Sequence, residues 1–421
     1  MGTPATRAPW WASPVGLVLG FLLPMYGVVS FAVHYDLTGL TARGIPFLDT
    51  RMLLLGVALL FVMALGGWLG QFITTRTPVA PPARQIDWAA LAIGIVALLS
   101  YLMWFRDYLL NPGRLFALLL GQVRPSRLDI ELVTGVTSLA NITPVFFTIY
   151  AWRRVFQRGE RFAPWMTALA LMLAACTLFR VYAWSERLAL IEAALPVMLL
   201  GALGAMRSKR RWLRALVPLA PFLALPVLLL FFGLAESVRS WTSSTYFGKL
   251  GFWEFVIGRL ASYYYTSLNN GAGLLAMYDW PPWTFHFVLG GLHTAPLSVG
   301  ALFNDLVGSK TSVLSHFLRV YGDPEFNNPS GLYTVVFDLG LPLAIVYFAV
   351  TGFMAGALYR RYASGMFYAS LAYPMFFIMY LEVFRYPYLG SGRALAWAVG
   401  ILVVVLLTLP VATRPRLALQ T

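Results

Sequence analysis

Uncharged runs of about twenty apolar residues recur from one end of the chain to the other, which is the length a helix needs to cross a bilayer. Of the 421 residues, 59% are hydrophobic and only 11% are charged, too apolar a balance for a water-soluble globule. Backbone exposed to lipid must satisfy its own hydrogen bonds, and no ten-residue alternation typical of a membrane barrel is present. The sequence therefore predicts an all-α protein, a polytopic transmembrane helical bundle forming a single integral membrane domain over 1–421.

Hydropathy predicts about ten membrane spans. The predicted spans are 13–33, 52–72, 87–105, 137–152, 163–179, 190–206, 215–235, 335–357, 366–383 and 393–411. Basic clusters at 153–161, 207–214 and 359–362, and the RPR tail, fall on one side if the N- and C-termini are both cytoplasmic. This topology accounts for much of the net charge of +14, so we expect no nucleic-acid partner.

The same alternation places a large segment, 236–334, on the outer side of the membrane. It is rich in Trp, Tyr, Phe and Gly and contains semi-apolar stretches, so we expect a large, partly helical extracytoplasmic loop that lies on the membrane surface or re-enters it. No internal repeat is visible, which argues against many secondary transporters.

Charged residues are concentrated at 180–192, RVYAWSERLALIE, between two apolar runs. Charges at membrane depth are costly and tend to mark a site or to pair with one another. If the segment is helical, Arg180 and Arg187 share a face and form a clamp for an anion such as a diphosphate. The alternative is a short outer turn in which both arginines snorkel and Glu186 balances them.

A second cluster lies in the outer segment, where Arg239 and Arg259 frame an aromatic stretch. Aromatic faces stack on sugar rings, and amides and hydroxyls bind sugar hydroxyls. The candidate sugar-binding residues are Tyr263, Tyr264, Tyr265, Asn269 and Asn270. An interfacial aromatic belt with snorkelling arginines is the alternative, and it needs no ligand.

Asp338 lies inside an otherwise apolar helix about one turn from its outer end, where a carboxylate needs a partner or handles a proton. Arg385, on the next outer loop, is a candidate partner in a structural ion pair or a phosphate contact. Asn327 and Asn328 have turn chemistry and are further candidates for substrate binding.

Metal and cofactor chemistry is not indicated. The four histidines lack metal-binding spacing, and the single Cys176 lies in an apolar run, so we expect no metal site and no cofactor.

Several of these motifs occur in an order that resembles the bacterial oligosaccharide repeat-unit polymerases of O-antigen and exopolysaccharide assembly. They are SERLALIE at 185–192 with Arg180 upstream, RSW at 239–241, YYYTSLNN at 263–270 and NNPSG at 327–331 followed by DLG at 338–340. The resemblance implies a glycosyltransferase of the bacterial inner membrane, similar in fold to O-antigen ligase-like enzymes, whose site opens outward. It would join glycans carried on undecaprenyl diphosphate, in membrane lipid, alongside a chain-length regulator and a flippase of the same pathway.

The residues fit that chemistry. Arginines can stabilise the charge that develops on a diphosphate leaving group without a metal. We assign this role to Arg180, Arg187 and Arg259, with Arg239 next. Either Glu186 or Asp338 would act as the general base for the acceptor hydroxyl.

Three alternatives remain at this stage. A ligase-like transferase would use the same donor and a different acceptor. A polyprenyl-monophosphate-dependent transferase usually carries acidic residues in its first outer loop, where this chain has Asp36 and Asp49 without an acidic pair. A flippase or transporter would line a central path with its charges, whereas the notable charges here fall mainly outside.

Overall fold

The computed structural model describes residues 8–35, 44–73, 80–122, 133, 135–157, 159, 162–184, 186–237, 241, 251–309 and 313–409. Throughout these ranges the chain forms helices, turns and loops, with no strand. The all-α, helical membrane class predicted from the sequence is confirmed at this level.

The chain divides into two compact units, each assembled from separate segments. Unit 1 comprises residues 1–75, 202–364 and 373–395, and unit 2 comprises 76–201, 365–372 and 396–421. The boundary falls within three helices: α9 (Arg187–Met206), α17 (Phe367–Glu382) and α18 (Gly392–Thr408). The single membrane domain expected over 1–421 stays a prediction.

The other helices belong to one unit or the other. Unit 1 holds η1 (Trp10–Ala12), α1 (Pro14–Leu17), η2 (Val18–Leu22), α2 (Leu23–His34), α3 (Thr50–Gly70), α10 (Arg211–Leu216), η5 (Val217–Leu219), α11 (Ala220–Glu236), α12 (Phe252–Met277), α13 (Gly290–His293), α14 (Val299–Val307), α15 (Val313–Val320), α16 (Tyr333–Ser364) and η7 (Tyr388–Gly390). Unit 2 holds α4 (Ala83–Trp104), α5 (Arg106–Leu109), α6 (Pro112–Leu119), η4 (Thr137–Ile142), α7 (Thr143–Phe156) and α8 (Pro164–Trp184).

Seven helical segments of the described chain are long and apolar enough to cross a membrane. They are Pro14–Ala32, Thr50–Gly70, Ala83–Trp104, Pro164–Trp184, Arg187–Met206, Arg211–Leu234 and Tyr333–Ser364. The other three predicted spans, 137–152, 366–383 and 393–411, correspond to α7, α17 and α18, which have 14, 16 and 17 residues. These fall short of the roughly 20 residues that a span perpendicular to the membrane needs.

The segment expected outside the membrane, 236–334, is largely helical where it is described. It contains the 26-residue α12 and the three short helices α13, α14 and α15. α12 is not among the seven segments apolar enough to cross a membrane. The side of the membrane on which this segment lies stays a prediction.

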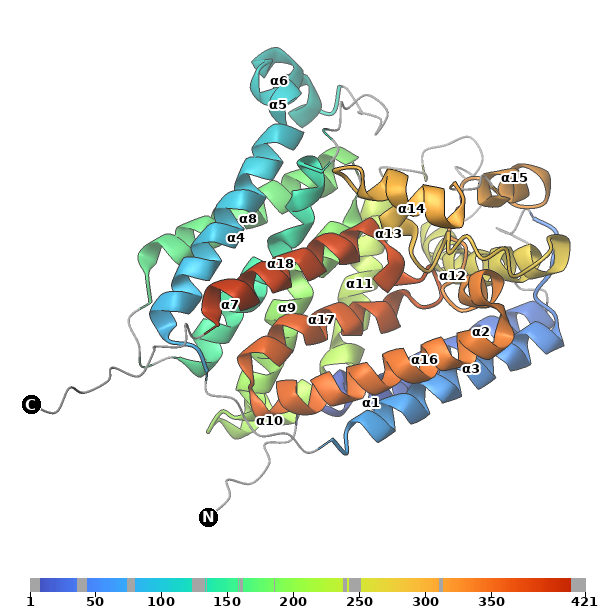
Figure 1. Ribbon diagram of the computed structural model, residues 1–421, viewed down its shortest axis with the longest axis horizontal. Helices are drawn as coiled ribbons and strands as arrows, with labels where there is room; N and C mark the ends of the chain where they lie inside the picture. Colours follow the sequence, from blue (N-terminus) through green and yellow to red (C-terminus); the bar gives the residue numbers. More distant parts are fainter. Residues whose placement is uncertain are drawn as a thin grey trace, which may run out of the picture. The chain divides into compact units, whose positions relative to one another are not determined.

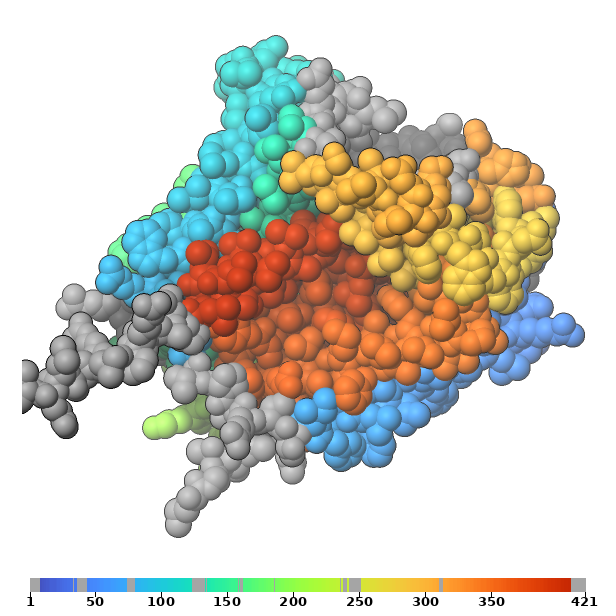
Figure 2. Space-filling model, in the orientation of Figure 1, coloured from blue at the N-terminus to red at the C-terminus, as the bar shows by residue number. Residues whose placement is uncertain are grey.

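The closest helix pairing in unit 1 is between α3 and α16, which run side by side (Figure 1) and are in direct contact in the space-filling view (Figure 2). Their contact depends on glycines spaced four residues apart on both helices, Gly66 and Gly70 on α3 and Gly352 and Gly356 on α16. A methyl group placed on Gly356 would lie 2.0 Å from the carbonyl oxygen of Gly67. Only glycine therefore permits the two backbones to approach this closely.

A break in α16 separates its first turns from the long apolar part. Gly340 has φ of 72°, a left-handed conformation that glycine adopts without steric cost. Asp338 therefore lies in a short helical segment just before the break, which gives its side chain a position distinct from the rest of the helix.

Candidate functional site

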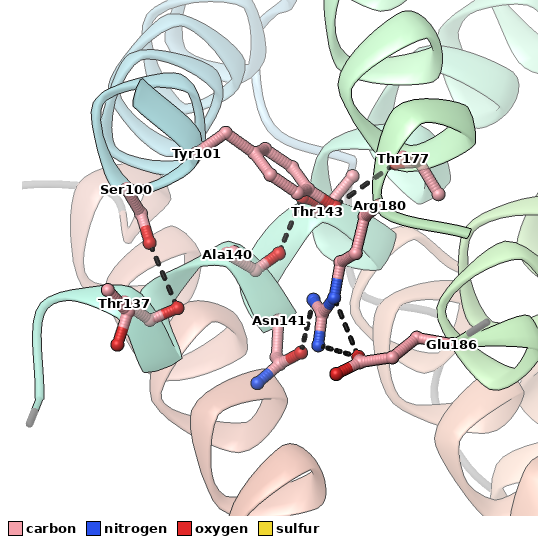
Figure 3. Close-up of polar contacts among 9 residues, drawn as sticks. All are labelled: Ser100, Tyr101, Thr137, Ala140, Asn141, Thr143, Thr177, Arg180 and Glu186. Carbon is pink, nitrogen blue, oxygen red and sulfur yellow. Dashed lines mark hydrogen bonds and ion pairs between the residues drawn. The ribbon is translucent and has the colours of Figure 1, made fainter. Parts of the chain in front are cut away.

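The first charged cluster lies in unit 2, where α8 ends and α9 begins. Figure 3 shows the Arg180 guanidinium between Asn141, from η4, and Glu186. Arg180 Nε donates to Glu186 Oε2 at 2.7 Å, its Nη2 pairs with the same oxygen, and its Nη1 donates to Asn141 Oδ1 at 3.0 Å. The side chains of Arg180 and Glu186 are 2% and 4% exposed, so the pair is removed from bulk water.

Local contacts hold η4, and with it Asn141, in place. The Ser100 hydroxyl of α4 donates to the carbonyls of Val136 and Thr137 at 2.7 and 3.2 Å. At the other end of η4, the Thr143 hydroxyl donates to the carbonyl of Ala140 at 2.6 Å (Figure 3). Asn141 is thereby positioned to bind the guanidinium.

The guanidinium also lies over an aromatic cluster. Arg180 Cζ is 4.1 Å from the centroid of the Trp104 ring, a cation–π contact. Trp104 lies near Trp184, and Trp184 stacks on Phe105 at 5.6 Å between ring centroids. The indole N–H groups of both tryptophans are buried without a hydrogen-bond partner among the described residues.

The condition for an arginine clamp, a helix that continues through residues 180–192, is not met. α8 ends at Trp184 and α9 begins at Arg187, so Arg180 and Arg187 do not lie on a common helical face. The predicted alternative, a turn in which Glu186 balances an arginine, describes the segment better, although Arg180 is buried rather than snorkelling. Arg187 is half-buried at the first position of α9.

The second charged cluster lies in unit 1 and is centred on Arg259 of α12. Its Nε donates to Glu236 Oε2 at 2.6 Å and its Nη2 to Glu325 Oε1 at 2.5 Å. Arg259 and Glu236 are 1% and 0% exposed, whereas the Glu325 side chain is 32% exposed. Burial alone would lower the pKa of Arg259, but the two carboxylates outweigh it and hold the pKa above its usual value.

Aromatic rings enclose this arginine as well. Arg259 Cζ lies 5.1 Å from the ring centroid of Phe326 and 5.7 Å from that of Tyr263, whose rings are 5.2 Å apart. The predicted residues Arg259 and Tyr263 are therefore brought together, one helical turn apart on α12. Tyr265 is buried.

The two asparagines predicted to bind sugar are both buried and both hold loop backbone. Asn269 Oδ1 accepts from the backbone N–H groups of Phe47 and Leu48 at 2.6 and 3.1 Å, and its Nδ2 donates to the Ile45 carbonyl at 2.8 Å. This accounts for most of its hydrogen-bonding capacity. Asn269 is thus an anchor for the loop that precedes α3.

Asn270 anchors a second loop. Its Nδ2 donates to the carbonyls of Phe326 and Asn328 at 2.8 and 3.1 Å, which holds the segment leading to α16 along α12. Of the asparagine pair in that segment, Asn327 is exposed and Asn328 is half-buried. Asn327 is the one whose side chain faces solvent.

Asp338 and Arg385 do not form the predicted ion pair. Asp338 Oδ2 accepts from the backbone N–H groups of Phe287 and Val288 at 2.6 and 2.8 Å, and its buried Oδ1 has no hydrogen-bond partner in the described chain. Two residues before Phe287, Phe285 has φ of 53°, a left-handed conformation that is strained for an aromatic residue. The carboxylate therefore stabilises a strained loop and keeps one oxygen uncommitted.

Arg385 pairs with Glu382, through Nη1 at 3.0 Å to Oε1 and 2.8 Å to Oε2. Burial would lower the pKa of Arg385, but Glu382 outweighs it and raises that pKa. Burial raises the pKa of Tyr264, the nearby Glu382 raises it further, and Arg385 partly offsets this rise. Arg239 lies outside the described residues.

The sequence reasoning missed the glutamates that bind the arginines, Glu236, Glu325 and Glu382. Glu236 and Glu382 each end an apolar helix, the same signal that identified Asp338. In the described ranges, no three His, Cys, Asp or Glu side chains gather as a metal site.

Comparison of the chain with protein-family models, with curated proteins and with solved structures found no match.

Proposed function

We propose that this chain is a glycosyltransferase of the bacterial inner membrane that polymerises oligosaccharide repeat units carried on undecaprenyl diphosphate. In this proposal α7, α17 and α18 complete a bundle of ten spans, and segment 236–334 lies on the outer side. The observation that carries the proposal is the pair of buried, glutamate-held guanidiniums, Arg180 and Arg259, in a chain with seven membrane-length apolar helices.

Buried guanidiniums suit a diphosphate leaving group because arginine stays charged and its donors match phosphate oxygens. The ion pair and Asn141 use three of the five N–H donors of Arg180. A site whose donors are already fixed needs little reorganisation when charge develops in the transition state. Arg180 would therefore keep Glu186 as an orienting partner while its other donors bind phosphate.

Arg259 would bind phosphate by a different route. Glu236 is fully buried and would stay in place, whereas the partly exposed Glu325 carboxylate occupies a position on the guanidinium that a phosphate oxygen can take. We therefore expect Glu325 to move aside when the donor binds. Arg187 would contribute further positive charge beside Arg180, and Arg239 and Arg385 are the remaining candidates for phosphate contact.

The transfer step forms a bond between an acceptor sugar hydroxyl and the anomeric carbon of the donor glycan, and breaks the bond from that carbon to the diphosphate. The hydroxyl proton passes to a general base. Of the two predicted bases, Asp338 fits better, because one of its oxygens has no hydrogen-bond partner among the described residues, whereas Glu186 is held in an ion pair by Arg180. Tyr263 to Tyr265, Asn327 and Asn328 would contact or position the sugar.

The test is to incubate the purified full-length protein with a synthetic undecaprenyl-diphosphate repeat unit, without ATP or added metal, and to separate the products by gel and mass spectrometry. We expect a ladder of polymers that Arg180→Lys and Arg259→Lys abolish. Arg319→Ala is the matched control, since Arg319 is an exposed arginine in the same outer segment and makes no ion pair among the described residues.

Other outcomes of this assay would favour a different function or refute the roles of the arginines. A single transfer onto a different acceptor would support a ligase-like enzyme, and movement of the lipid across vesicles without any transfer would support a transporter. A full ladder from both lysine variants would refute the roles assigned to the arginines.

A further inference from the structure

Unit 2 contains a hollow that lies apart from the Arg180 cluster. Its volume is about 490 Å³, and it is formed by the first turns of α4, the end of α7 and the start of α8. α4 and α8 are both long and apolar enough to span a membrane. If both helices cross it, a hollow at their first turns lies at headgroup depth. The topology predicted from the basic loops places this end on the cytoplasmic side.

The hollow is lined by two arginines and one aspartate, and only one of the arginines is paired with the aspartate. Arg153, 1% exposed, binds Asp87 through two hydrogen bonds of 2.8 and 3.2 Å, and its Nη1 donates to Gln157 at 2.7 Å. This pair neutralises Asp87. Arg84, also in the lining, is exposed and has no ion-pair partner in the part of the chain that the structure describes. The hollow therefore carries a net positive charge that Arg84 can direct at a ligand.

Two tryptophans, together with Ala83 and Leu91, supply the apolar part of the lining. Trp88 follows Arg84 by one turn of α4 and is 61% exposed, and Trp165 contributes from the second residue of α8. Tryptophan is enriched where a membrane meets water, because its ring is apolar and its N–H is polar. A guanidinium beside two such rings matches a ligand with a phosphate at one end and hydrocarbon at the other.

We propose that this hollow binds the phosphate headgroup of an anionic membrane lipid. Arg84 contacts the phosphate, the Arg153–Asp87 pair forms the fixed polar floor, and Trp88 and Trp165 flank the glycerol and the first methylene groups. Basic pockets between membrane helices on the cytoplasmic side commonly bind anionic headgroups. The proposal does not depend on the glycosyltransferase activity, because it concerns binding at a separate place in unit 2.

The test measures lipid retention by native mass spectrometry on the full-length protein. The purified chain is exchanged into micelles containing phosphatidylglycerol, phosphatidylcholine or undecaprenyl monophosphate at equal concentration. We expect phosphatidylglycerol to be retained over phosphatidylcholine, and Arg84→Gln to weaken retention by about fivefold, the effect of one arginine near an anionic surface. Stronger retention of undecaprenyl monophosphate would identify the carrier lipid as the source of the phosphate.

A matched control separates the hollow from general surface charge. Arg211 is likewise exposed in the first turn of a membrane-length helical segment with a basic flank, so Arg211→Gln removes the same charge elsewhere. Retention should be unaffected by this substitution. Equal retention of phosphatidylglycerol and phosphatidylcholine, or equal losses in the two variants, would overturn the proposal. Ala83→Phe, which fills the hollow without changing charge, should displace the lipid as Arg84→Gln does.

Discussion

The ion pairs of Arg259 should contribute unequally to stability, because Glu236 is fully buried and Glu325 is partly exposed. Arg259→Met leaves the fully buried Glu236 without its cation, and breaking a buried pair in this way costs about 3–5 kcal/mol. Glu325→Gln changes a carboxylate that is 32% exposed, and we expect a cost below about 1 kcal/mol. The decisive variant is the double one, Arg259→Met with Glu236→Leu. It removes both buried charges and should recover most of the stability lost in Arg259→Met.

The free energy of unfolding can be measured by SDS titration in mixed micelles, read by the fluorescence of the 14 tryptophans. We expect the double variant to be more stable than Arg259→Met by at least about 2 kcal/mol. The single variant Glu236→Leu is measured as well. If the double variant loses as much stability as Arg259→Met and Glu236→Leu together, within about 0.5 kcal/mol, Arg259 and Glu236 are not coupled. The electrostatic account of this cluster would then be refuted.

Three further predictions concern other parts of unit 1. Asn269→Ala removes the hydrogen-bond partner of three backbone groups at 45–48, of which the Leu48 N–H is buried and the other two are partly buried. Leaving the buried group unsatisfied should cost about 1–3 kcal/mol, and amide hydrogen exchange at 45–48 should accelerate. Asp338→Asn keeps an oxygen for the N–H groups of 287–288, so thermal stability should change little while glycosyl transfer falls, whereas Asp338→Ala should lower both. Gly356→Ala forces the two helices apart and should cost about 1–3 kcal/mol in unfolding free energy.

Each of these predictions can be refuted, and the glycine substitution also has a matched control. Gly201→Ala adds the same methyl in α9, where nothing lies within 4 Å, so it should be neutral or stabilising by up to about 1 kcal/mol. A loss as large as that of Gly356→Ala would mean that helix contact is not the cause. Full transfer activity in Asp338→Asn would exclude this carboxylate as the base, and unchanged exchange at 45–48 in Asn269→Ala would contradict its anchoring role.

Hydropathy predicted the helical class and the position of the seven membrane-length helices, because the length of an apolar run is itself a property of the sequence. Hydropathy could not decide whether the shorter helices α7, α17 and α18 cross the membrane. The glycine spacing on α3 and α16 was readable in the sequence, but its meaning depends on the two helices being paired.

The candidate site was predictable in its residue types and less so in its pairings. Arg180, Arg259 and Asp338 stood out because charge is rare in apolar runs. Glu186 is only six residues from Arg180, but the other partners come from more distant positions: Glu325 is 66 residues from Arg259, and Asp338 binds backbone 50 and 51 residues away. Such pairings are set by tertiary structure and leave no local pattern.

Two adjacent amide side chains on α12 connect loops that are far apart in the sequence. Asn269 holds the loop that enters α3, Asn270 holds the loop that enters α16, and α3 and α16 are in close contact through their glycines. A displacement of α12 would therefore carry both loop ends in the same direction, rather than opening a gap between them. Glu325 lies in the loop that enters α16, next to Phe326, whose carbonyl Asn270 binds. An anion that displaces Glu325 from Arg259 would therefore pull on a loop that Asn270 ties to α12.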